Sequence, residues 1–181
     1  MTVNRCNLMK YIGLLIIALF LVNTSPAQTM KIRLFFHNTK EDPEMLDCNK
    51  VYEVERTIPK TKAVATAALN ELFKGVNAGE KAQGFTSIPP EATKGILKRI
   101  NIKKRIAYVN FNDVVYEQMG VATTSCGSGY FASVEQTLKQ FPTIEKVVYA
   151  IEGSPRDFYE WIQVGECPDP IKDCSGKNFD E

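Results

Sequence analysis

Cys126 is the residue whose sequence neighbours best suit nucleophilic chemistry. It stands in Ser125-Cys126-Gly127-Ser128-Gly129, directly before a predicted helix, where backbone N–H groups and the helix dipole would favour a thiolate. His37 is the only histidine of the chain and could act as its base. The alternative is that Cys126 is a disulfide partner and that the glycines allow a tight turn into the helix. An oxidising compartment would favour the disulfide.

Other patterns for catalysis or ligand binding are weaker. Ser125 and Ser128 do not stand in the Gly-x-Ser-x-Gly pattern of hydrolase nucleophiles. No His and Cys residues have zinc-ligand spacing. The acidic segment 42–47 is interrupted by Pro43 and lacks the glycine of a calcium-binding loop. We therefore predict no catalytic residues, no metal site and no cofactor.

The N-terminal segment 1–27 has the three parts of a secretory signal peptide. Arg5 and Lys10 give a basic start, Tyr11–Val22 is an apolar run, and the small residues Ser25 and Ala27 follow two apart. The apolar run is shorter than the ~20 residues that a membrane-spanning helix needs. We expect cleavage after Ala27 and export to the periplasm or the extracellular space, with a retained membrane anchor as the alternative.

Cysteine usage agrees with export. Cys6 would leave with the signal peptide, so that four cysteines remain, and an even number in an oxidising compartment suggests two disulfides. Cys167 and Cys174 are close together in a proline-rich turn, and we expect them to pair. That leaves Cys48 to pair with Cys126.

Charge gives no argument for a nucleic-acid or membrane partner. The full chain has 22 Lys and Arg residues against 21 Asp and Glu residues, and the signal segment removes two of the basic ones. A near-neutral mature chain lacks the excess basic charge that binds phosphate backbones or anionic lipid. The local basic cluster at 98–105 is interpreted as a solvated strand face and turn.

Hydrophobic periodicity predicts five strands and two main helices. Alternation of apolar and polar residues marks most of the strands, whereas the run Lys146–Glu152 is apolar on both faces and is typical of a central strand in a covered sheet. Thr61 is a favourable N-cap for the first helix, and Pro142 ends the second. The predicted strands are 31–37, 51–58, 95–103, 106–111 and 146–152, and the helices are 62–74 and 127–141.

These elements predict an α+β fold with the order β-β-α-β-β-α-β. We expect a single mixed β-sheet with the two main helices packed on one face. Residues 28–153 would form the domain, and residues 154–181 would be a C-terminal appendage with a disulfide-closed loop.

The chain resembles the GerMN domain family of sporulation and spore germination proteins. The resemblance covers about residues 31–153, and it rests on the order and spacing of several short segments. These segments are Ile32–Phe36, Val54–Pro59, Ala67–Gly75, Glu80–Phe85, Ile88–Pro89, Ala107–Phe111, Gly127–Gly129, Glu135–Thr143 and Ile151–Gly153.

The resemblance implies a compact α+β fold similar to ring-building motifs, and assembly in the cell envelope through protein contacts. It implies no catalytic residues. We therefore expect a non-enzymatic module whose partner is an envelope or extracellular protein, with a second copy of the chain as a further possibility. Alternatives are a module that binds cell-wall glycan or a small ligand, and a Cys-dependent hydrolase.

An aromatic group after Gly153 supplies the candidate partner-binding residues, because Trp and Tyr dominate contact hot spots. The alternative is that this group docks onto the open sheet face of its own domain. The candidates are Phe158, Tyr159, Trp161 and Ile162.

Overall fold

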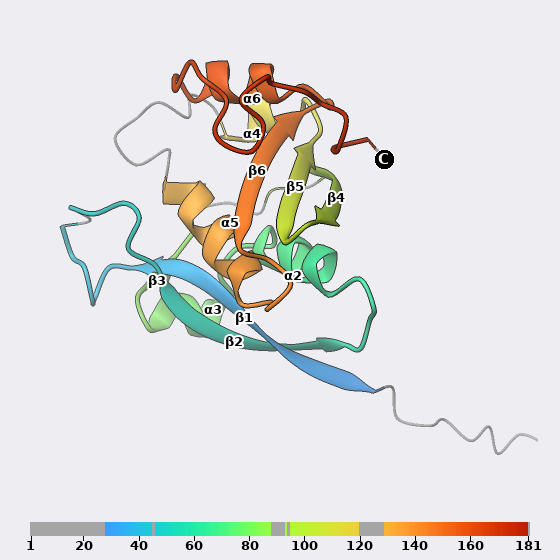
Figure 1. The fold of residues 1–181 in the computed structure, drawn as a ribbon. Helices are drawn as coiled ribbons and strands as arrows, with labels where there is room; N and C mark the ends of the chain where they lie inside the picture. The colour runs from blue at the N-terminus through green and yellow to red at the C-terminus, as the bar shows by residue number, and fades with distance from the viewer. Residues whose placement is uncertain (1–27, 45, 88–92, 94, 120–128, 181) are drawn as a thin grey trace, which may run out of the picture.

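The computed structural model describes residues 28–44, 46–87, 93, 95–119 and 129–180 (Figure 1). Predicted features in segment 1–27 and at residues 120–128, Cys126 among them, lie outside this part of the chain. The elements are β1 (Thr29–Asn38), β2 (Tyr52–Pro59), α2 (Val64–Leu72), α3 (Ala78–Ala82), β3 (Phe85–Thr86), β4 (Leu97–Lys103), β5 (Ile106–Phe111), α4 (Val115–Met119), α5 (Gly129–Lys139), β6 (Lys146–Ile151) and α6 (Pro155–Trp161).

The α+β class and the order of the main elements are confirmed, but the single sheet is wrong. The described strands form two three-stranded sheets, in the orders β2-β1-β3 and β4-β5-β6. The edge of β1 opposite β2 pairs with the short strand β3 at His37 and Asn38. Next to it on the same edge lies α5, where the N–H of Phe35 donates to Thr137 Oγ1 at 3.2 Å. Among the described strands, none of the second sheet pairs with β1.

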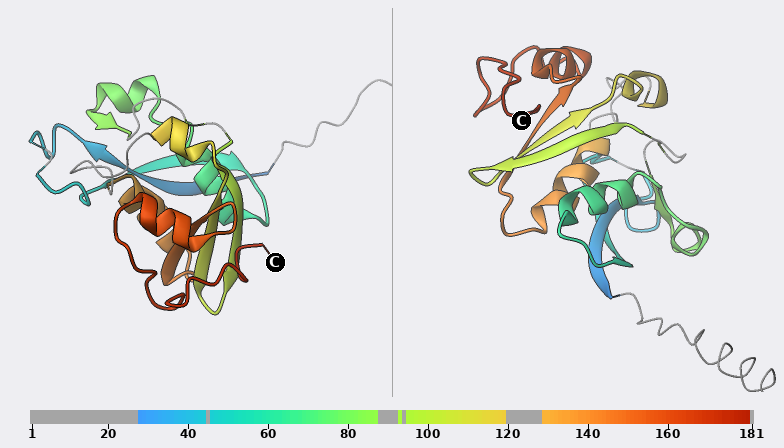
Figure 2. Two further views of the ribbon diagram at one scale, coloured as in Figure 1. Left: turned by 90° about the horizontal axis from the view of Figure 1, so that it is seen from above. Right: turned by 90° about the vertical axis from the view of Figure 1, so that its right-hand side faces the viewer.

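Helices α2 and α5 lie between the two sheets, as the right-hand view of Figure 2 shows. Apolar side chains from every layer meet there and are buried. They are Ile32, Leu34 and Phe36 of β1, Ala68, Leu69 and Leu72 of α2, Val109 and Phe111 of β5, and Val134 and Leu138 of α5. The predicted amphipathic stripes therefore face the core, and each helix packs against both sheets.

Helix α2 begins later than its sequence suggests. Thr61 Oγ1 accepts a hydrogen bond from the N–H of Ala63 at 3.1 Å, so it stabilises a turn before the helix. The N-cap residue is Ala63, which makes no side-chain cap. The first N–H groups of the helix are thus without the side-chain acceptor that a Ser, Thr, Asp or Asn N-cap supplies.

The predicted hairpin of β4 and β5 is confirmed. The strands pair antiparallel from Leu97↔Phe111 to Lys103↔Ile106. Lys104 and Arg105 make the turn with φ of 50° and 63°, the left-handed conformation that a two-residue hairpin loop requires. Asn and Gly favour this conformation, and their absence is why the turn was hard to recognise in the sequence.

Strand β6 is an edge strand and not the central strand that its apolar sequence suggested. Of the described strands, only β5 pairs with it, in parallel. Both of its faces are nevertheless buried. Tyr149 contacts Phe131 of α5 and Phe158 of α6 at ring-centroid distances of 5.3 and 4.8 Å, and Val148 and Ala150, on the alternate face, are also buried. An edge strand that is buried on both faces has the same apolar composition as a central strand.

The segment predicted as an appendage contributes to the hydrophobic core. Phe158, Ile171 and Phe179 are buried within the same cluster as the strands. The chain from α6 onward turns back over β4 and β5 (Figure 1).

Candidate interaction site

The buried imidazole of His37 lies against the start of α5 and the backbone of Cys48. A Cβ at Gly129 would come within 3.1 Å of His37 Nε2 and 2.3 Å of the Cys48 carbonyl oxygen, so only glycine fits there. Burial lowers the pKa of His37, and the nearby backbone of Gly129 and Lys50 and the carboxylate of Asp42 oppose that shift. The imidazole is therefore held neutral. Whether a thiol of Cys126 faces it lies outside the described residues.

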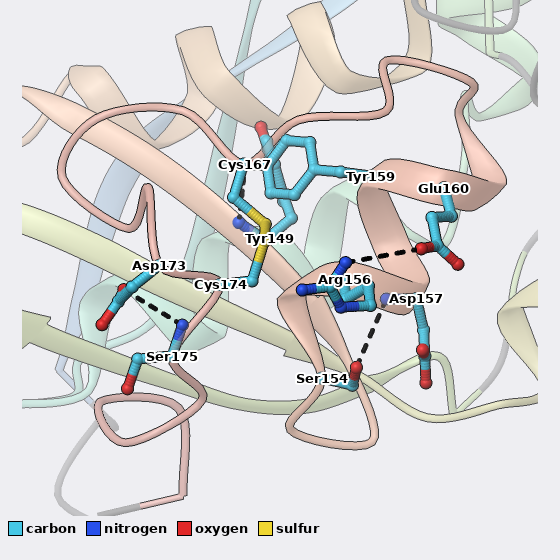
Figure 3. The surroundings of a disulfide bond; sticks show 10 residues. All are labelled: Tyr149, Ser154, Arg156, Asp157, Tyr159, Glu160, Cys167, Asp173, Cys174 and Ser175. Carbon is cyan, nitrogen blue, oxygen red and sulfur yellow. Dashed lines mark hydrogen bonds and ion pairs between the residues drawn. A yellow bond between two sulfur atoms is a disulfide. The ribbon is translucent and has the colours of Figure 1, made fainter.

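The cysteines of the C-terminal loop are joined to each other (Figure 3). Cys167 and Cys174 form a disulfide with an S–S distance of 2.10 Å and a Cα–Cα distance of 5.5 Å. Cys48 is also disulfide-bonded, and its pairing with Cys126 stays a prediction. A hollow of about 680 Å³ beside the Cys167–Cys174 bridge has a rim of mixed charge from Arg156, Glu166, Asp169 and Lys172.

The structure corrects the role expected of two predicted aromatic residues. Phe158 is 0% exposed and Tyr159 is buried, so neither ring is available to a partner. Desolvation raises the pKa of Tyr159 to about 12, and its hydroxyl accepts a hydrogen bond from the N–H of Tyr149 at 3.3 Å. Trp161 and Ile162 are half-buried and remain candidates.

An apolar groove of about 410 Å³ lies between the start of α2 and β4. Ile102 is 42% exposed and, with Ile100, forms the wall that β4 contributes. In the described part of the chain, β4 has a strand on one side only. The groove is lined by Lys62, Ala63, Val64, Ala65, Thr66, Ile100, Ile102, Phe141 and Thr143.

Positive charge lies on one side of this groove. Lys62 lines it, and Lys104, which is exposed, follows Ile102 by two residues. The uncapped N-terminus of α2 adds partial positive charge. An extended segment lying along β4 could give backbone hydrogen bonds to the strand and place alternate apolar side chains in the groove. The residues between them would point to the opposite face of the sheet, the face that carries Arg99 and Lys103 of β4, so we expect acidic residues at those positions.

Two kinds of site were not found among the described residues. No group of three or more His, Cys, Asp or Glu side chains is arranged to hold a metal ion. Within the same residues, no helix has both the length and the apolar character that crossing a membrane requires.

Comparison with known families agrees with this fold. Residues 33–157 match the family model described as Germane, sporulation and spore germination. The chain belongs to the Germane family. The match covers more than half of the chain, and it confirms the resemblance inferred from the sequence. No match was found among curated proteins.

Solved structures similar to this Germane protein include two from Bacillus subtilis. The tandem GerMN domains of the sporulation protein GerM match with 22% identity and a TM-score of 0.49, over 70% of this chain and 40% of that one. The chain thus spans less than half of the tandem structure. A putative lipoprotein from Clostridium perfringens matches with 18% identity and a TM-score of 0.39, over 72% of this chain and 80% of that one.

Sequence reasoning missed the groove beside β4 in this Germane protein. The alternation of Ile100 and Ile102 with polar residues indicated a strand with one buried face. It did not indicate that part of this face lines a groove. The other walls of the groove include Lys62 and Phe141, whose positions depend on the tertiary fold.

Proposed function

We propose that this Germane protein is an exported, non-enzymatic module that binds another envelope protein through β4. The partner contributes an extended segment in which apolar and acidic residues alternate. The observation that carries the proposal is that, in the described residues, β4 has a strand on one side only and lies beside an apolar groove lined by Lys62. Export is supported by the signal-peptide pattern of residues 1–27.

Strand addition suits this geometry for a physical reason. The edge of β4 opposite β5, which pairs with no other described strand, offers backbone donors and acceptors to an extended chain, while the groove selects for side chains. Ile102 would lose the solvent exposure that it has in the free protein, which supplies part of the binding free energy. Proteins normally protect such edges, so an open edge beside an apolar groove suggests a partner.

Site-directed photo-crosslinking in the producing cells tests this proposal. A photoreactive phenylalanine analogue would replace Ile102 in β4, and in a matched variant it would replace Thr57, which is exposed on β2. We expect a discrete adduct with one envelope protein from position 102 and not from position 57. Val64→Glu, which places a carboxylate in the groove, should remove the adduct. Equal labelling from both positions, or none from 102, would contradict the proposal.

The hydrolase alternative has its own test. Titration of the exported protein with an alkylating reagent, before and after denaturation, counts free thiols. The proposal expects none, because all four mature cysteines would be in disulfides. An alkylatable Cys126 in the native protein would instead support thiol chemistry with His37.

A further inference from the structure

The outer face of the β4–β5 hairpin holds the last described residues of the chain, Ser175–Asp180, which we call the tail segment. Phe179 is its single apolar anchor. The Phe179 side chain is 0% exposed, and its ring meets that of Tyr108 edge-on at a centroid distance of 5.3 Å.

A buried amide recognises the acidic residue that follows this anchor. Asn110 of β5 is 1% exposed, and its Nδ2 donates to Asp180 Oδ1 at 3.1 Å. Its Oδ1 accepts from the N–H of Gly153 at 2.9 Å, which fixes the orientation of the amide. A Cβ at Gly153 would lie 2.4 Å from Asp180 Oδ2, so this glycine leaves the space that the carboxylate occupies.

Side chains of β4 bind the backbone of the tail segment. Arg99 Nη1 donates to the carbonyl of Asp180 at 2.6 Å, and Asn101 Nδ2 donates to the carbonyl of Asn178 at 3.0 Å. Lys103 Nζ also donates to Asn178 Oδ1 at 3.2 Å. Hydrogen bonds to backbone carbonyl groups can form with a bound segment of any sequence. The contacts of the Phe179 ring and the Asp180 carboxylate instead require those side chains.

The face under the tail segment differs in chemistry from the inner face of the same hairpin. The inner side chains of β5 are apolar, whereas the outer ones include the polar groups of Tyr108 and Asn110 beside Arg99 and Asn101 of β4. Polar groups on a sheet face can be hydrated when that face is uncovered. The tail segment also starts directly after Cys174, so its release leaves the disulfide loop in place.

We propose that this outer face is a binding site for a partner segment in which an aromatic residue precedes an aspartate, and that the tail segment occupies it intramolecularly. The inference deepens the interaction function proposed above and rests on it. Its surface is distinct from the groove beside β4, so the two can fail separately. A partner segment would replace the Phe179 ring on Tyr108 and the Asp180 carboxylate on Asn110.

The covalent link to the domain sets how strongly the tail segment competes with a free peptide for the outer face. A segment linked by a short flexible chain has an effective concentration on the order of millimolar. A free peptide at micromolar concentration therefore competes poorly with it. Weakening the intramolecular contact should raise the apparent affinity for the free peptide by about tenfold or more.

Fluorescence polarisation with a labelled peptide Ser-Gly-Lys-Asn-Phe-Asp, the sequence of residues 175–180, tests the inference on the full chain. Phe179→Ala is expected to bind the peptide at least about tenfold more tightly than the unchanged protein. Lys177→Ala, which alters an exposed side chain, should bind like the unchanged protein. Adding Arg99→Ala to Phe179→Ala should weaken binding, and a peptide with Ala in place of Phe should not bind.

Three results would overturn the inference. Near-UV circular dichroism reports whether Phe179→Ala is folded; a folded variant that does not bind the peptide would mean that the face is no peptide site. An unfolded Phe179→Ala, with Asp180→Ala folded and no better than the unchanged protein at binding, would make the tail segment an obligatory part of the core. A concentration-dependent dimer that Phe179→Ala abolishes would assign the face to the tail of a second copy.

Discussion

The side-chain amide of Gln140 binds both backbone groups of Arg33. The N–H of Arg33 in β1 donates to Gln140 Oε1 at 2.9 Å, and Gln140 Nε2 donates to the Arg33 carbonyl at 2.6 Å. These are the two bonds that a residue of a neighbouring strand would make. The residue that follows α5 thus closes an edge of β1 that β2 leaves open, and it limits edge-to-edge association.

Gln140→Ala is expected to lower the free energy of unfolding by about 1–2 kcal/mol, because two hydrogen bonds to a strand edge are lost. Urea denaturation followed by circular dichroism measures the change. Gln136→Ala, at an exposed position of the same helix, is the matched control and should change stability by less than about 0.5 kcal/mol. Equal effects of the two substitutions would show that the bonds to Arg33 contribute nothing.

Arg56 of β2 and Glu80 of α3 form a largely buried ion pair, with Arg56 Nη2 and Glu80 Oε2 2.5 Å apart. Glu80→Ala should destabilise the fold by about 3 kcal/mol, because it removes the nearer carboxylate partner of the buried guanidinium and leaves Glu71, at 3.4 Å, as the other. Glu55→Ala is the control, since its pair with Lys31 is exposed and should be worth less than about 1 kcal/mol. Denaturant unfolding of both variants makes the comparison, and similar losses would count against a special role for Arg56.

Acid should weaken the fold through the same pair. Burial alone would raise the pKa of Glu80, but hydrogen bonds from Arg56 and from the N–H of Asn77 outweigh it, so the net pKa is lowered from 4.5. A lowered carboxyl pKa stabilises the folded state above the ordinary value, and that stability is lost as the pH falls through the lowered value. A free energy of unfolding that stays constant from pH 5 to pH 3 would contradict this.

The lowered pKa of His37 predicts that the free energy of unfolding also depends on pH in a higher pH range. Its pKa is lowered from 6.5, mainly by burial, so the unfolded chain binds more protons than the folded one below that pH. The free energy of unfolding should therefore fall as the pH drops from 6.5 toward the lowered pKa. His37→Gln removes the titration and should flatten this part of the profile while leaving the effect of Glu80. An unchanged slope near pH 6 in His37→Gln would assign it to another group.

Phe158→Ala tests the corrected role of the C-terminal aromatic residues. The Phe158 ring packs against Tyr149 at 4.8 Å and Phe131 at 5.0 Å, so its loss should cost about 3–5 kcal/mol. Val164→Ala, at a position 60% exposed, should cost little. Thermal or denaturant unfolding of both variants measures these changes in stability. A Phe158→Ala variant as stable as the unchanged protein would contradict a core role and make Phe158 a candidate partner contact again.

Local patterns were enough to predict most of the elements. The apolar stripes of α2 and α5 and the alternation in β4 and β5 depend on residues close in sequence, and the structure has these elements near their predicted bounds. The pairing of strands was not predictable in the same way. The alternation of Ile32, Leu34 and Phe36 is the same whether the neighbour of β1 is a strand or the helix α5.

Burial of side chains by segments distant in sequence was also not predictable. Phe179 stands among polar residues at the end of the described chain, and Phe158 belongs to an aromatic group for which the sequence left partner contact and docking on its own domain both open. Both are buried because α6 docks on β6 and the tail segment returns to Tyr108. The groove beside β4 has the same origin, since Lys62, Ile102 and Phe141 are distant in sequence and only the fold brings them together.

Amide hydrogen exchange on the complex with the protein cross-linked at position 102 tests strand addition most directly. If the partner segment lies along β4, amides of Leu97–Lys103 should exchange more slowly in the complex, while those of Tyr52–Pro59 in β2 should not change. Protection confined to β2, or to neither strand, would contradict the proposal that β4 is the docking edge.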